Sequence, residues 1–148
     1  MEKTFLGNNL EICRILNGMW QVAGGHGQID SELAIQDMEK YQELGFTTWD
    51  LADIYGPAES LIGDFNKKTK QNFQAFTKFV PNPGPMSNSI VTYYIEESLK
   101  KMNVDCIDLL QFHWWDYQDS SYLDALQHLS KLQNEGKIKH LGLTNFDT

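Results

Sequence analysis

The stretch that decides the fold spans residues 45–56 and reads Gly-Phe-Thr-Thr-Trp-Asp-Leu-Ala-Asp-Ile-Tyr-Gly. Its first glycine can end a helix, and the short apolar run Thr47–Leu51 that follows is typical of a buried strand. Asp50 stands near the end of that run, and Tyr55 follows five residues later in a predicted loop. The stretch therefore predicts a helix, a strand and a loop that carries polar side chains.

The same alternation of short apolar runs and amphipathic stretches extends along the rest of the chain. The runs that predict strands are Ile12–Leu16, Thr47–Leu51, Phe73–Phe79, Ile107–His113 and Ile138–Leu143. The stretches with helical periodicity are Glu32–Leu44, Glu59–Lys67, Ile90–Met102 and Tyr122–Glu135. Helix-capping residues agree with these limits at Asp30-Ser31, at Ser87 to Ser89 and at Gly136. Strands that alternate with helices and no linker between them predict one domain, residues 1–148, with a parallel sheet.

Such a series closes either as an open doubly wound sheet or as a (β/α)₈ barrel. The open sheet usually has a Gly-x-Gly-x-x-Gly loop directly after its first strand. Gly24, Gly25 and Gly27 lie several residues beyond the first predicted strand, and their spacing is different. We therefore expect an α/β fold of the TIM barrel type. Since a complete barrel needs roughly 250 residues, the chain is expected to be truncated after about the fifth strand.

Polar side chains stand at the carboxyl end of each predicted strand from the second onward, where parallel barrels place their active sites. These candidates are Asp50, Tyr55, Lys78, His113, Thr144 and Asn145. Each has a simpler interpretation alone: a helix cap, a turn aromatic, a strand-end charge or a core histidine. Together they suit one chemistry. A lysine, oriented by an aspartate, can stabilise a tyrosine phenolate while a histidine directs a carbonyl oxygen.

Four segments in the same order resemble those of the aldo-keto reductases. They are residues 45–56 followed by Glu59, then Phe76-Thr77-Lys78, then Asp108 to His113, and Gly136 to Phe146. Leu16 to Trp20 is similar to the family's segment after the first barrel strand. The resemblance implies reduction of an aldehyde or ketone with a nicotinamide dinucleotide, NADP(H) rather than NAD(H). It also implies a catalytic tetrad of Asp50, Tyr55, Lys78 and His113, with Thr144 and Asn145 at the nicotinamide carboxamide.

Some residues depart from the family pattern without touching the tetrad: Leu51, Thr144 and Lys139. Trp114 and Trp115 follow His113 directly and are bulky for that loop. With Trp20 they predict an aromatic-walled pocket for an apolar or flat carbonyl substrate. Packing in the core is an equally good interpretation of these three side chains.

Composition limits the class of partner. The net charge of −8 argues against a nucleic-acid partner, and no apolar stretch is long enough to span a membrane. Cys13 and Cys106 are too few and too far apart for a metal site or a disulfide framework. We therefore expect a cytoplasmic protein without a metal, although organellar import stays open. The identity of the carbonyl substrate and the oligomeric state are not predicted.

Two alternatives to a reductase stay open at this point. One is a non-enzymatic, nucleotide-sensing regulatory subunit of an ion channel, because barrels of this family also occur in that role. The other is an inactive gene fragment. Whatever the function of the whole protein, we expect residues 1–148 alone neither to bind NADPH tightly nor to reduce an aldehyde, because the segments that bind the cofactor's phosphates in the family would come later.

Overall fold

The computed structural model describes residues 1–7, 9–25, 27–70 and 73–147 of the 148-residue chain. Its main feature is a five-stranded parallel sheet in which the strands follow chain order. The strands are β3 (Asn17–Gly18), β4 (Thr48–Asp50), β5 (Gln74–Phe79), β6 (Ile107–His113) and β7 (Ile138–Thr144). A parallel sheet that keeps chain order with helical crossovers is part of a barrel wall. The predicted partial barrel is thereby confirmed.

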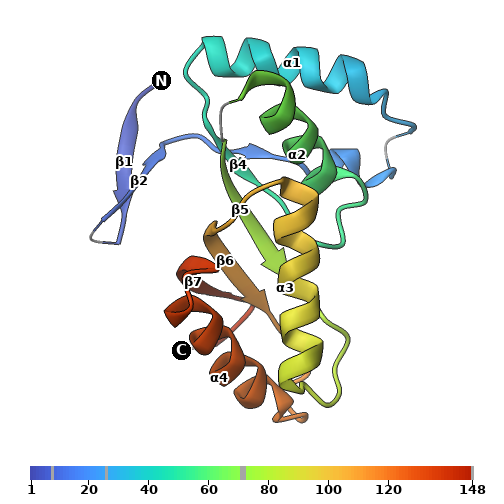
Figure 1. Cartoon of the computed structure of the whole chain (residues 1–148), viewed down its shortest axis with the longest axis vertical. Coiled ribbons are helices and arrows are strands. Elements are labelled where there is room, and N and C mark those ends of the chain that lie inside the picture. Colours follow the sequence, from blue (N-terminus) through green and yellow to red (C-terminus); the bar gives the residue numbers. More distant parts are fainter. Residues whose placement is uncertain (8, 26, 71–72, 148) are drawn as a thin grey trace.

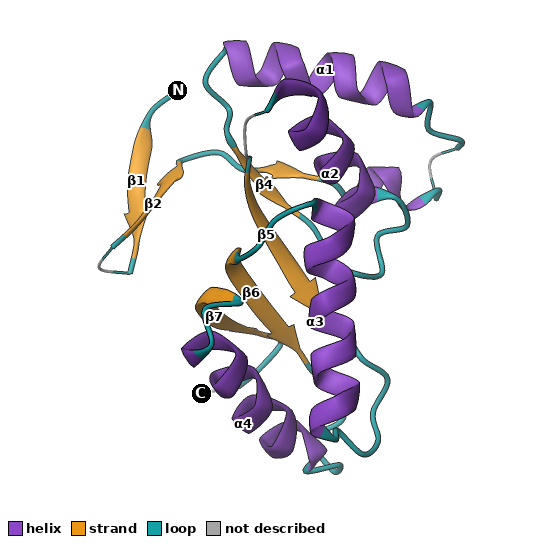
Figure 2. Cartoon of the chain, viewed as in Figure 1, coloured by secondary structure: helices purple, strands orange, loops and turns teal. Residues whose placement is uncertain are grey.

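Helices connect these strands and lie together on one side of the sheet (Figures 1 and 2). They are α1 (Ser31–Glu43), α2 (Ala58–Thr69), α3 (Asn88–Met102) and α4 (Ser121–Asn134), and the short 3-10 turn η1 (Trp20–Ala23) follows β3. The predicted caps are confirmed, since the Asp30 side chain accepts from the first turn of α1 and the Ser87 side chain accepts from Ile90 N. Gly45 and Gly136 both have positive φ just after a helix, which favours glycine.

The core lies between the sheet and the helices. The large side chains that are fully buried there include Phe65, Phe79, Ile95, Leu110 and Phe112. Helices α2 and α3 approach closely at Gly63, where a Cβ would overlap the carbonyl oxygen of Lys101. The helix layer is therefore packed to the limit that a glycine allows.

The N-terminal segment differs from the prediction. The run Ile12–Leu16 was expected to be the first barrel strand, but β1 (Lys3–Leu6) and β2 (Leu10–Cys13) pair as an antiparallel hairpin outside the parallel sheet. The first strand of the sheet is the two-residue β3, in the segment expected to follow that strand. The physical reason is that a short apolar run looks the same whether it pairs in a hairpin or in a barrel.

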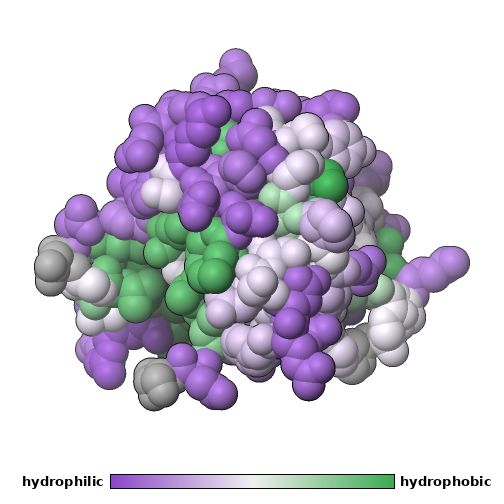
Figure 3. All heavy atoms as spheres, turned by 90° about the horizontal axis from the view of Figure 1, so that it is seen from below, coloured by the Kyte–Doolittle hydropathy of each residue, from purple (hydrophilic) through white to green (hydrophobic). Residues whose placement is uncertain are grey.

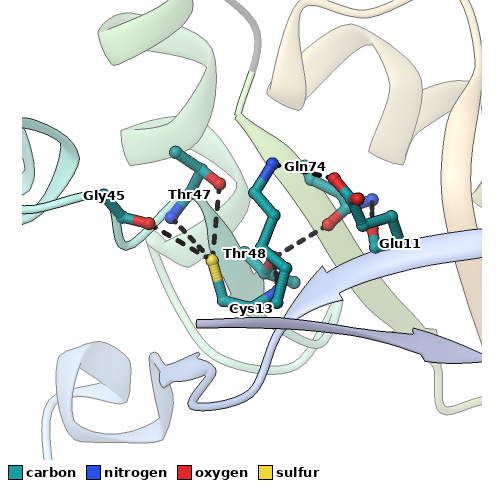
Figure 4. A network of polar contacts seen from close by, with 7 residues as sticks. Glu11, Cys13, Gly45, Thr47, Thr48 and Gln74 are labelled. Carbon is teal, nitrogen blue, oxygen red and sulfur yellow. Dashed lines mark hydrogen bonds and ion pairs between the residues drawn. The ribbon is translucent and has the colours of Figure 1, made fainter. Parts of the chain in front are cut away.

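The hairpin is anchored at the amino ends of the parallel strands (Figure 4). Cys13 N donates to Thr48 Oγ1 at 3.0 Å, and Gln74 Nε2 donates to the carbonyl of Glu11 at 2.8 Å. Thr48 is the first residue of β4, and Gln74 is the first residue of β5. Leu10 and Ile12 also pack against Phe76 and Leu109 of the sheet, and the four side chains form a small buried apolar cluster. The hairpin thus covers this end of the partial barrel.

The two outer strands of the sheet, β3 and β7, each have one parallel neighbour within the described residues. Figure 3 shows a green, apolar area on the left of the face seen from below, beside mostly polar surface. Exposed large hydrophobic side chains include Phe5, Ile15 and Leu143. Across the described ranges, no helix is long and apolar enough to cross a membrane.

Candidate active site

Parallel strands bring the polar candidates to one end of the sheet. Asp50 is the last residue of β4, Lys78 is next to last in β5, and His113 and Thr144 are the last residues of β6 and β7. His113 and Thr144 are register partners. Tyr55 lies in the turn between β4 and α2, where its N–H donates to Ala52 O at 3.0 Å. The carboxyl ends of four neighbouring strands therefore form one polar surface.

The Lys78 side chain lies between Asp50 and Tyr55. Its Nζ donates to Asp50 Oδ2 at 2.7 Å and to the carbonyl of Leu51 at 2.8 Å. The same nitrogen lies 5.3 Å from the centre of the Tyr55 ring. The Lys78 side chain is 11% exposed and that of Asp50 is 32% exposed, so the pair is shielded from much of the solvent. An ammonium held in this way applies its charge to a tyrosine ring beside it.

The acidity of Tyr55 differs from the prediction. We expected the Lys78 ammonium to lower the pKa of Tyr55, but burial and then the nearby Asp50 carboxylate raise that pKa above its usual value. Since Lys78 is ion-paired with Asp50, the negative partner offsets its charge at the phenol. Tyr55 therefore holds its proton at neutral pH.

His113 stands on the other side of Lys78, at the end of β6. Burial and then the positive charge of Lys78 lower the pKa of His113 below its usual value. Its ring lies edge to face with Trp115, with centres 5.2 Å apart. At neutral pH the imidazole is therefore uncharged and can make a hydrogen bond to a carbonyl oxygen.

The two candidates at the end of β7 are already hydrogen-bonded within the protein. Thr144 Oγ1 donates to Gln111 Oε1 at 3.1 Å, and Asn145 Nδ2 donates to the carbonyl of Trp114 at 2.8 Å. Asn145 has a positive φ of 66°, a conformation that asparagine tolerates better than most residues. The turn after β7 is thereby fixed against the loop that follows β6.

The three tryptophans have different surroundings. Trp114 is fully buried in the core cluster, rings of Phe112 and Tyr122 pack near it, and its indole N–H donates to Asp116 O. Trp20 and Trp115 are exposed. Trp114 is therefore a core residue, as the alternative interpretation of its sequence proposed. Only Trp20 and Trp115 could form an aromatic wall at this end of the sheet.

A buried group of charged residues lies behind the site. Glu59 is 2% exposed, accepts from Thr77 Oγ1 at 2.8 Å and pairs with Lys101 at 3.6 Å. Burial raises the pKa of Asp53 to about 6, and its carboxylate accepts from Val80 N. In the part of the chain that is described, no group of three His, Cys, Asp or Glu residues could hold a metal ion.

Comparison with known proteins decides the family. The sequence model of the Aldo/keto reductase family matches residues 14–148. The chain belongs to this family. An aldo-keto reductase of Strobilurus tenacellus is 33% identical over 132 residues, covering 82% of this chain and 38% of its own length. A 6-dehydroglucose reductase of Agrobacterium fabrum is 31% identical over 167 aligned residues, covering 99% of this chain and 54% of its own length.

Solved structures of aldo-keto reductases show the same fold. A thermostable aldo-keto reductase in complex with the inhibitor epalrestat superimposes with a TM-score of 0.83 at 24% identity, covering 99% of this chain and 55% of that one. The holo form of an aldo-keto reductase from Bacillus halodurans gives a TM-score of 0.79 at 23% identity, with 97% and 50% covered. The chain thus spans between about 37% and 54% of the first curated relatives that it matches.

Sequence reasoning missed one residue of this aldo-keto reductase surface. Gln111 was not among the candidates, yet its Nε2 donates to Asp50 Oδ1 at 3.0 Å. The available signal was its position two residues before His113, because alternate residues of a strand face the same side. The N-terminal hairpin also had a signal, since Gly7 separates two short apolar runs.

Proposed function

We propose that the protein carrying this chain reduces an aldehyde or ketone to an alcohol with a nicotinamide dinucleotide. The observation that carries the proposal is the Lys78 ammonium, which lies against the Asp50 carboxylate and beside the Tyr55 ring at the carboxyl end of the strands. Membership of the aldo/keto reductase family supports it. So do the names of similar proteins, which include an aryl-alcohol dehydrogenase and a methylglyoxal reductase.

Each proposed catalytic residue has a role that follows from its environment. Tyr55, which keeps its proton at neutral pH, donates that proton to the oxygen of the former carbonyl. Lys78 stabilises the phenolate as the proton leaves, and Asp50 holds Lys78 in place. His113, uncharged because its pKa is lowered, donates the hydrogen bond that directs the carbonyl oxygen.

Thr144 and Asn145 are the proposed residues for the nicotinamide carboxamide. A hydroxyl that donates to Gln111 keeps lone pairs for an amide N–H, and the partly buried end of β7 faces the same surface as His113. These residues fit such a group. The nicotinamide supplies the hydride, and the protein supplies position and charge. We propose NADP(H) rather than NAD(H), and a small-molecule carbonyl with Trp20 and Trp115 lining its pocket.

Residues 1–148 are proposed to be one barrel domain that is incomplete at its carboxyl end, although Thr148 lies outside the described residues. Five parallel strands and the greater length of the relatives support this. Hydrogen bonds to Thr144 and Asn145 contribute on the order of 1 kcal/mol each. We therefore propose that this segment alone does not bind a dinucleotide tightly, because immobilising the ligand costs several kcal/mol.

The test replaces Tyr55 by Phe in the protein at its full natural length. The rate of NADPH-dependent reduction of nitrobenzaldehyde should fall by a factor of about 10² to 10⁴, because the proton donor is lost. The dissociation constant of NADPH should stay within about twofold, because the phenol hydroxyl is not part of the proposed cofactor site. Tyr93→Phe, an exposed tyrosine on α3, is the matched control and should not change the rate.

Two results would contradict the proposal. A Tyr55→Phe rate within a few-fold of wild type would show that another acid donates the proton. Wild-type protein that binds NADPH saturably but reduces none of a panel of aldehydes would favour the nucleotide-sensing alternative.

A further inference from the structure

Gln111 lies in the middle of the polar surface, on β6. Its neighbours Leu110 and Phe112 are fully buried in the core between sheet and helices. Since side chains alternate along a strand, Gln111 and His113 project from the opposite face, toward the inside of the partial barrel. In the register of β5 and β6, Gln111 is the partner of Lys78.

The side-chain amide of Gln111 joins two of the proposed sites. Its Nε2 donates to Asp50 Oδ1 at 3.0 Å, while its Oε1 accepts from Thr144 Oγ1 at 3.1 Å. Asp50 Oδ2 in turn accepts from Lys78 Nζ at 2.7 Å. A continuous chain of hydrogen bonds therefore runs from β7 through β6 and β4 to β5.

The direction of each hydrogen bond in this network follows from the charge of Asp50. A carboxylate paired with an ammonium can only accept, so the NH₂ end of the Gln111 amide must face it. The oxygen end then faces Thr144, and the Thr144 hydroxyl must donate its single proton to it. The Thr144 hydroxyl oxygen therefore has only lone pairs left for a ligand, and it can accept a hydrogen bond from the N–H of a carboxamide.

We propose that Gln111 is a positioning residue that couples the Asp50–Lys78 pair to Thr144, setting the Thr144 hydroxyl as the acceptor for a nicotinamide carboxamide. This inference rests on the proposed function and goes further, because it assigns the orientation of the cofactor's reactive ring to a residue outside the tetrad. It also gives a role to a half-buried amide that stands between the fully buried Leu110 and Phe112.

The test compares two variants of the protein at its full natural length. Gln111→Met keeps the length of the side chain and removes both hydrogen bonds. Gln111→Glu keeps an acceptor for Thr144 but faces Asp50 with a second negative charge. Gln133→Met, which removes another glutamine amide that donates to Lys139 O near the surface, is the matched control. The ligands are NADPH and ADP-ribose 2′-phosphate, which lacks the nicotinamide.

Gln111→Met should raise the dissociation constant of NADPH roughly threefold to tenfold, the effect of losing one hydrogen bond, and should leave that of ADP-ribose 2′-phosphate unchanged. In a Thr144→Val background the same substitution should cost no further NADPH affinity. Gln111→Glu should bind NADPH nearly as wild type but lose roughly tenfold or more in kcat, with little change in the KM of the aldehyde.

Other outcomes overturn the coupling. If Gln111→Met weakens both ligands equally, the residue is structural. If neither variant changes NADPH affinity or kcat, Gln111 positions nothing. A wild-type protein that fails to bind NADPH would overturn the proposed function together with this inference, whereas wild-type binding with unaffected variants overturns the inference alone.

Discussion

The two ends of the same strands carry polar networks of different character. At the amino ends of β4 and β5, Thr48 and Gln74 are tied to the hairpin, and Thr48 Oγ1 donates to Gln74 Oε1 at 2.8 Å. At the carboxyl ends of these two strands, Asp50 and Lys78 form an ion pair beside Tyr55. At the amino ends, uncharged Thr48 and Gln74 side chains bond to backbone groups of the hairpin, whereas the network at the carboxyl ends contains an ion pair and lies at the polar surface.

We infer that the two ends of the strands have different roles. In barrel enzymes the amino ends of the strands serve stability and the carboxyl ends serve chemistry. Cys13 illustrates the structural end, since its buried thiol contacts Gly45 O and Thr47 (Figure 4). Burial alone would raise the pKa of this thiol, yet hydrogen bonds from Thr47 and then Thr48 lower it overall. Substitutions at the two ends should therefore affect different measurements.

The largest effect is expected at the carboxyl end. Lys78→Met in the full-length protein should lower the rate of aldehyde reduction by a factor of about 10² or more, because the phenolate of Tyr55 loses its neighbouring cation. Steady-state kinetics measures this effect. Lys67→Met, on the exposed surface of α2, is the control and should keep the wild-type rate. Equal rates for the two variants would remove Lys78 from the proposed mechanism.

A smaller effect of another kind is expected at the amino end. Thr48→Val leaves Cys13 N and Gln74 without their partner, so the free energy of unfolding should fall by about 1–3 kcal/mol. Thr48→Ser keeps the hydroxyl and should lose less. Urea denaturation measures stability, and activity per folded molecule should be unchanged for both. A large loss of activity without a loss of stability would break the division between the ends.

The smallest expected effect concerns Asp53, whose carboxyl group sits behind the site near Glu59 and Lys101. Burial raises its pKa from 3.8 to about 6 in the folded protein. The folded state therefore binds the proton more readily than the unfolded state, so this contribution to stability is full below about pH 4 and is lost as the pH rises to about 6. Because the group is partly exposed, the loss should be about 1 to 2 kcal/mol.

Asp53→Asn should flatten that part of the pH dependence, because an amide imitates the protonated acid and can still accept from Val80 N. The measurement is urea denaturation at several pH values between 4 and 7 for both proteins. Asp64→Asn, an exposed carboxylate on α2, is the matched control. Identical pH profiles for wild type and Asp53→Asn would show that Asp53 is not the titrating group.

Local sequence predicted much of the fold because its signals are local. Ile107–His113 is a strand within the predicted limits, and Asp30 and Ser87 cap their helices as expected. The run Ile12–Leu16 failed because pairing in a hairpin or in the barrel depends on where the rest of the chain lies. A helix-capping side chain bonds to a backbone N–H two or three residues further along the chain, so it can be predicted from local sequence. The strand with which a given strand pairs cannot be predicted from that strand's own residues.

The same distinction holds for the site. The sequence by itself determined which side chains stand at the carboxyl ends of the strands, because strand period and order fix Asp50, Lys78, His113 and Thr144 there. Only the tertiary structure decided that Gln111 bridges Asp50 and Thr144, and that the pKa of Tyr55 is raised. Hydrogen-bond partners and pKa values depend on distances and burial in three dimensions, and residues 33 or more positions apart in the chain meet only after folding.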